Sequence, residues 1–225
     1  MEGQQPLTSE EAEAWHIEIH RPYLTAHPEL MDSSQPAEPA HVWCAAKLPD
    51  DIWWRSAATH EAAHALMAWL LGFEVRRLSL ARDRSVLEGG GCSVGGRGDA
   101  QHYTLVWLSA GHAQARWLTE HGYTHPELRR CVLEHGTLGD HRIVDGYAAA
   151  GFVLDREQAI TDAQHVLGEP CAAAALSALA DLLLAEGELD AGRITDCLVA
   201  QRAVRTPAVK VWVPGQRLPL IAAAA

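Results

Sequence analysis

The chain has 225 residues, of which 48% are apolar and 21% are charged, a balance typical of a folded globular protein. Its net charge of −11 argues against general nucleic-acid binding, which needs basic surface to replace phosphate counterions. No apolar run reaches the roughly 18 residues of a membrane span, and the N-terminus lacks the pattern of a secretory signal. Five widely spaced cysteines without a CxxC pair indicate reduced thiols. We therefore expect a cytoplasmic protein with neither nucleic acid nor membrane as partner.

The first segment of the chain, residues 1–50, is predicted to be an acidic arm and linker. Residues 1–51 hold ten of the 29 acidic residues but only two of the 18 basic ones. Asp32–Ala40 has the composition of a linker. Before it, Thr8 and Glu11 form a candidate capping box for a short helix, and a partly ordered arm is the alternative.

A helical pattern begins near residue 50. Ser56 is a candidate cap for a helix that runs to Leu71 and ends at Gly72. Glu74–Leu80 has the length and composition of a short strand. The glycine-rich segment Glu88–Gly98 lacks the order of a nucleotide-binding P-loop, so we expect a loop or an edge-strand hairpin there.

Further helices fill the rest of the chain as far as residue 201. Asp99 is expected to cap a helix to about Glu120, and Thr124 with Glu127 to open another that reaches about His135. Four more helical stretches are predicted: from Asp140, over Asp155–Leu167, over Cys171–Ala185, and from Asp190 to about Gln201. The sequence thus predicts a mainly α (α+β) fold, with a domain over residues 51–203 and a proline-containing tail over residues 204–225.

The motif His60-Glu61-Ala62-Ala63-His64 carries the chemistry. Residues four apart lie on one face of a helix, so the two imidazoles can share one tetrahedral zinc ion, and Glu61 can take a proton from its water. With 13 histidines, a chance match is not negligible, and ordinary core or surface histidines are the alternative. The small and apolar neighbours favour a metal, because they bury the motif, and unpartnered polar groups are costly there.

A catalytic zinc site needs a third protein ligand, and residues 65–71 hold no histidine. Asp140 stands out because it follows a glycine break and opens a helix, where backbone N–H groups can hold a carboxylate. The alternative is that it only caps that helix. The candidates are Asp99, His102, His112, Glu134, His135, Asp140 and His141.

Several segments resemble the peptidase domain of the FtsH-type ATP-dependent zinc metalloproteases. Thr59–Gly72 (THEAAHALMAWLLG) is similar to the zinc-binding helix of that family, and Leu179–Leu198 to its closing helical pair. Val106–Leu118 and Gly136–Ala148 are weaker matches in the same order, and the match places the family's aspartate ligand at Asp140. Over roughly residues 50–201, the resemblance implies a helical zinc-peptidase domain with a small β element beside the site.

The resemblance also implies the site. It assigns His60, His64 and Asp140 as ligands of one zinc ion per chain, and Glu61 as the general base. The Arg and Glu of the family's Ala-Gly-Arg-Ala-Ala-Glu segment are replaced by His112 and Ala115. The ATPase and membrane helices that precede the family's domain have no counterpart in residues 1–50, so we do not expect ATP-driven unfolding from this chain.

We therefore expect a zinc-dependent endopeptidase that acts on peptides or unfolded proteins. The alternatives are a catalytically weak or inactive protein of this fold that serves as an interaction or regulatory module, and a structural zinc protein with a fourth ligand such as His112. A homo-oligomer and a separate unfoldase or adaptor are left open by the resemblance.

Overall fold

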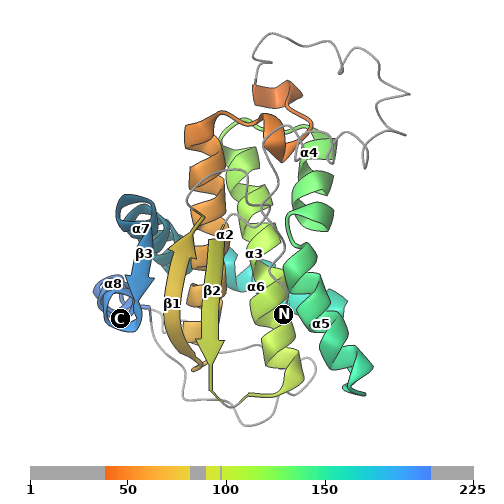
Figure 1. The fold of residues 1–225 in the computed structure, drawn as a ribbon, viewed down its shortest axis with the longest axis vertical. Helices are drawn as coiled ribbons and strands as arrows, with labels where there is room; N and C mark the ends of the chain where they lie inside the picture. Colours follow the sequence, from red (N-terminus) through yellow and green to blue (C-terminus); the bar gives the residue numbers. More distant parts are fainter. Residues whose placement is uncertain (1–38, 82–89, 97, 204–225) are drawn as a thin grey trace.

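The computed structural model describes residues 39–81, 90–96 and 98–203 (Figure 1). The predicted capping box at Thr8, most of the predicted linker and the tail from residue 204 lie outside these ranges. Within them the fold is mainly helical with one small antiparallel sheet, which confirms the predicted α+β class. The elements are α2 (Asp50–Leu70), β1 (Glu74–Leu80), β2 (Gly90–Gly95), α3 (Ala100–Glu120), α4 (Pro126–Arg130), α5 (Leu138–Ala149), α6 (Arg156–Gly168), α7 (Pro170–Glu186), β3 (Glu188–Asp190) and α8 (Ala191–Ala200).

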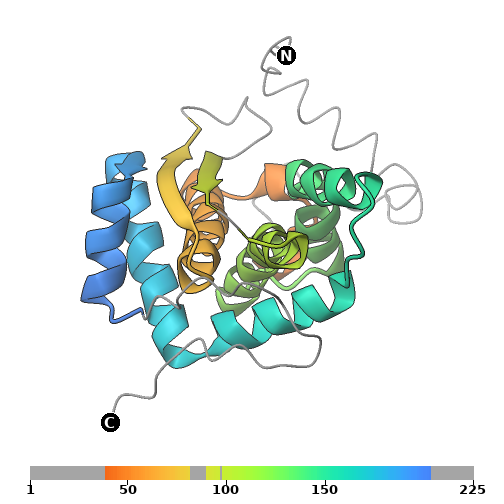
Figure 2. The same cartoon turned by 90° about the horizontal axis from the view of Figure 1, so that it is seen from below.

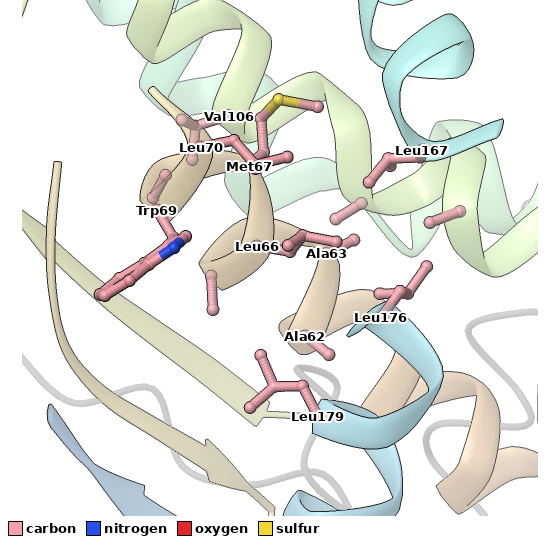
Figure 3. Packing of buried hydrophobic residues seen from close by; sticks show 14 of the residues in the cluster. Ala62, Ala63, Leu66, Met67, Trp69, Leu70, Val106, Leu167, Leu176 and Leu179 are labelled. Atoms are coloured by element: carbon pink, nitrogen blue, oxygen red, sulfur yellow. The ribbon is translucent and has the colours of Figure 1, made fainter. Parts of the chain in front are cut away.

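Helix α2 lies at the centre of the molecule. Every residue from Ser56 to Leu70 is buried, and apart from Thr59 and the motif residues His60, Glu61 and His64 they are all apolar or small. It packs against α3, α7, β1 and β2. Figure 3 shows its residues Leu66 and Met67 among side chains from α3, α6 and α7. The HExxH motif therefore sits in a rigid, close-packed scaffold.

The start of α2 differs from the prediction. Ser56 does not cap the helix, because α2 begins at Asp50, with Pro49 in the cap position. Asp50 and Asp51 occupy the first turn, where the positive end of the helix dipole favours carboxylates. The hydroxyl of Ser56 instead donates to the carbonyl of Trp53, 2.9 Å away, inside the helix.

The sheet has the order β2-β1-β3, and β1 pairs antiparallel with both neighbours. The predicted strand Glu74–Leu80 is confirmed, and the glycine-rich segment forms the edge strand β2. Strand β3 was not predicted, since its three residues have no strand pattern of their own. Its pairing with Arg77–Ser79 is a tertiary contact, and Asp190 at its end also caps α8.

The remaining helices enclose α2 and α3. In the view of Figure 2, α6 runs below α3 and α7 lies to the left of α2, while α5 lies beside α3. In the part of the chain that the structure describes, no single helix is long and apolar enough to cross a membrane. Among these helices only the pair α6–α7 passes that test together, and it is bent by 84°.

Residues 39–48 pack onto the helical body, although the sequence places them in the N-terminal arm. Val42 and Leu48 belong to one apolar cluster with Leu118 of α3, Leu128 of α4 and Val132, which follows α4. Apolar side chains buried in this way fix the chain just ahead of α2. All five cysteines lie in the described ranges, and the structure has no disulfide between them.

The segment after α3 also corrects the prediction. Thr124 does not form a capping box with Glu127: the cap residue is His125, whose ring Nδ1 accepts from the backbone N–H of Glu127 at 3.1 Å. The helix changes to π geometry over Cys131–His135, and the N–H of Gly136 donates to the carbonyl of Cys131. Such one-turn π segments are frequent near functional sites.

Candidate metal centre

The two histidines of the motif lie one turn apart on the buried face of α2. His60 and His64 are 8% and 2% exposed, and their Nε2 atoms are 3.2 Å apart. Their rings meet edge to face. The helical repeat thus brings two imidazole nitrogens to one point, as the sequence predicts.

Asp140 completes the group from a different helix. It lies in the first turn of α5 and is 8% exposed. Its Oδ2 is 3.2 Å from Nε2 of His60, and its Oδ1 is 3.2 Å from Nε2 of His64. The cap position of α5 is occupied by Thr137 rather than by Asp140. Asp140 therefore does not merely cap the helix, because its carboxylate turns inward to the histidine pair.

A close contact between α3 and α5 sets the position of Asp140. Gly111 of α3 faces Thr137, and a Cβ at Gly111 would lie only 2.4 Å from Cγ2 of Thr137. The absence of a side chain at Gly111 lets the start of α5 approach α3. The carboxylate reaches α2 because of this approach.

A backbone carbonyl of α3 fixes the orientation of the His64 ring at its Nδ1 side. Its Nδ1 is 3.0 Å from the backbone carbonyl of Val106, which can only accept a hydrogen bond. The hydrogen of the neutral ring is therefore on Nδ1, and Nε2 carries a free electron pair toward Asp140. Nδ1 of His60 lies 3.1 Å from Oε1 of Gln114.

These three residues could hold a metal ion. Their ligand atoms all lie within 4.8 Å of one another, and they form the one such group in the described ranges. Oδ2 of Asp140 is buried and has no hydrogen-bond donor among the described residues. When both rings are neutral and carry their hydrogen on Nδ1, the two Nε2 atoms and the carboxylate oxygens are all acceptors, and a cation would satisfy them.

The electrostatics reflect the same proximity. Burial alone would lower the pKa of His64, but the charge of Asp140 and the hydrogen bond that the protonated ring donates to it outweigh burial and raise the pKa. Burial alone would raise the pKa of Asp140, but His64 and His60 hold it well below its usual range. The carboxylate is thus ionised at neutral pH and available as a ligand.

Glu61 lies on α2, and its side chain is buried against the edge strand β2, with an exposed fraction of 6% for the residue. Gly90 of β2 approaches it closely: a Cβ there would lie 2.8 Å from Cγ of Glu61 and 2.3 Å from the carbonyl oxygen of Ser79. The glycine is therefore required by close packing beside the motif rather than by the flexibility of a loop.

Two further side chains border the group. The ring of Trp107 packs edge to face on His64, with centroids 5.0 Å apart. Burial, Glu61 and Asp140 raise the pKa of the Cys92 thiol well above its ordinary value. In the absence of a metal that thiol is protonated at neutral pH, and Cys92 is not among the residues whose ligand atoms converge.

The other candidate ligands lie elsewhere. Asp99 caps α3 and pairs with His102, whose Nδ1 is 2.9 Å from its carboxylate. His112 is not among the residues whose ligand atoms converge with those of His60, and its Nδ1 lies 2.9 Å from Nε2 of Gln164 on α6. Two more are exposed or turned away: Glu134 lies near Arg130, and His141 contacts the carbonyl of Leu133. The side chain of His135 is outside the described part.

No model of a known protein family matches the chain, and no curated protein sequence matches it.

Sequence reasoning missed three contributors to the site, namely Gln114, the carbonyl of Val106 and Gly90. The motif gave no signal for Gln114, because its contact with His60 spans 54 positions. Val106 acts through its backbone, which no residue type reveals. Gly90 lies in a glycine-rich run that does not tell which glycine is sterically required.

Proposed function

We propose that the chain is a zinc-dependent endopeptidase. The observation that carries this proposal is the convergence of Nε2 of His60, Nε2 of His64 and the carboxylate of Asp140, with Glu61 next to the first of them on α2. Two imidazoles and one carboxylate are a donor set typical of catalytic zinc, which keeps a further position for water. The resemblance of the α2 sequence to the FtsH-type peptidase helix supports the same function.

The metal ion, Glu61 and the edge of β2 have separate roles in the proposed reaction. Zinc in such a site acts as a Lewis acid that polarises a peptide carbonyl and lowers the pKa of water. Glu61 accepts a proton from the attacking water and then delivers it to the leaving amine nitrogen. Its burial beside β2 keeps the carboxylate in one place, and the edge of β2 offers backbone groups to which an extended peptide can pair. Flexible peptides or unfolded proteins are therefore the proposed substrates, and folded proteins would require a separate unfoldase or adaptor.

The two departures from the family pattern do not fall on the metal group. Ala115 is 2% exposed and packs in the cluster with Val42 and Leu118, on another side of α3. His112 contacts Gln164 of α6. These positions therefore do not argue for an inactive protein, which remains the alternative outcome of the test below.

The test compares the full chain with Glu61→Gln on an unfolded, fluorescently labelled protein substrate. We expect both proteins to bind about one zinc ion, and hydrolysis to fall by about 10²–10⁴-fold in the variant, because the amide cannot accept the proton. Chelation should abolish the wild-type activity, and zinc should restore it. Equal hydrolysis by both proteins would contradict the role of Glu61. Zinc binding without hydrolysis of any unfolded substrate would favour an interaction module.

A further inference from the structure

The second nitrogen of His60 is held by a side chain rather than by the backbone. Nδ1 of His64 has a backbone carbonyl as its partner, which no substitution removes. Nδ1 of His60 faces the side-chain amide of Gln114, 3.1 Å away on α3. An amide offers an oxygen on one side and an NH₂ group on the other, so its orientation decides whether His60 donates or accepts there.

Ser56 determines the orientation of this amide. The Ser56 hydroxyl is fully buried and uses its one hydrogen on the carbonyl of Trp53, at 2.9 Å. Oγ of Ser56 can therefore only accept from Gln114, whose Nε2 lies 3.2 Å away. With the NH₂ group committed to Ser56, the amide must present Oε1 to Nδ1 of His60.

The consequence concerns which nitrogen of His60 carries the hydrogen. Without Gln114, a hydrogen on Nε2 could bond to Oδ2 of Asp140, only 3.2 Å away, and this would block Nε2 as a ligand. We propose that Gln114, oriented by Ser56, is a positioning residue that holds His60 in the Nδ1–H tautomer and keeps its Nε2 free for the metal.

This inference rests on the proposed metal site, so the first readout is made without metal. In the chelator-treated full chain at about pH 8.5, well above the ordinary imidazole pKa, nitrogen NMR distinguishes the two neutral tautomers. We expect Nδ1–H for His60 in the wild type and in Gln114→Glu, which keeps an acceptor. We expect Nε2–H in Gln114→Met. Ser56→Ala, which frees the amide to turn, should give a mixture. A wild-type His60 with its hydrogen on Nε2 would overturn the inference.

The second readout is zinc affinity, measured by competition with a chromophoric chelator. Gln114→Met should bind zinc about 10–100-fold more weakly, and Gln114→Glu should recover most of the loss. Gln164→Met is the matched control: it removes an amide that contacts the Nδ1 of His112, outside the metal group, and should leave the affinity unchanged. Unchanged affinity and tautomer in Gln114→Met would refute the role of Gln114. Absence of zinc binding by the wild type would refute the proposed function, while the tautomer would still decide this inference.

Discussion

At the scale of single residues, the site is built from groups that have little freedom. His64 is held by a backbone carbonyl, His60 by an oriented amide, and Asp140 by the close approach of two helices. Fixed ligands lower the cost of organising a metal site, because less side-chain entropy remains to be lost.

Gly90 provides a test of the contact between β2 and Glu61, the proposed general base. Gly90→Ala should destabilise the protein by about 1–3 kcal/mol and reduce peptide hydrolysis, because the new Cβ meets a backbone oxygen and the Glu61 side chain. Zinc affinity should change less than hydrolysis, since the ligands are not touched. Denaturant unfolding, a zinc competition assay and a peptidase assay measure these three effects.

The neighbouring glycine is the control for this prediction. A Cβ at Gly91 would lie 3.7 Å from Oγ of Ser79, an ordinary contact. Gly91→Ala should therefore change stability by no more than about 0.5 kcal/mol and leave hydrolysis intact. Similar behaviour of the two variants would show that Gly90 has no special steric role.

At the scale of elements, the approach of α5 to α3 brings Asp140, the proposed third ligand, to the two histidines. Gly111→Ala should push the start of α5 away and weaken zinc binding, because its Cβ would lie 2.4 Å from Cγ2 of Thr137. In contrast, a Cβ at Gly146 of α5 would meet no atom of the described residues within 4 Å. Gly146→Ala should stabilise the protein by about 0.5–1 kcal/mol through helix propensity and leave zinc affinity unchanged. Zinc titration and denaturant unfolding measure both effects in the two variants. Equal zinc affinities of Gly111→Ala and Gly146→Ala would contradict the role of the contact between Gly111 and Thr137.

The start of α3 gives a pH dependence. Burial lowers the pKa of His102 from its ordinary value of 6.5, although Asp99 opposes this effect. The unfolded chain therefore binds this proton more tightly than the folded one. The contribution to stability is complete above pH 6.5 and is lost as the pH falls below that value toward the folded pKa.

His102→Gln should remove this contribution. The free energy of unfolding of the metal-free protein, measured between about pH 7.5 and pH 5, should fall less steeply in the variant than in the wild type. Titrations shared by the two proteins cancel in the difference. If the free energy of unfolding fell more steeply with falling pH in the variant, the pKa of His102 would have to be raised by folding and not lowered.

At the scale of the whole molecule, the sequence predicts the parts that depend on local pattern. The residues His60 and His64 follow from helical spacing, the strand Glu74–Leu80 from composition, and the cap at Asp99 from residue type. Asp140 is one of several candidate ligands: its place after a glycine break at a helix start makes it stand out but also fits a simple cap, and the family resemblance then selects it as a ligand. Its place beside the histidines depends on the contact between α3 and α5, which no local pattern encodes.

The mispredicted parts share this dependence on tertiary contacts. Strand β3 exists because β1 lies beside it, and α2 extends back to Asp50 because residues 39–48 anchor its start on the helical body. Gln114 gains its role only from the pairing of α2 with α3. The roles of such residues depend on contacts between segments that are distant in sequence, so a single sequence does not reveal them.

The most direct test of the central claim is X-ray absorption at the zinc edge on the zinc-loaded full chain. The account predicts one zinc per chain with only nitrogen and oxygen neighbours at about 2.0–2.2 Å, two of them imidazoles. Asp140→Ala should lose oxygen ligation or lose the zinc altogether. A sulfur neighbour at about 2.3 Å, three or more imidazoles, or no bound zinc near neutral pH would contradict the account.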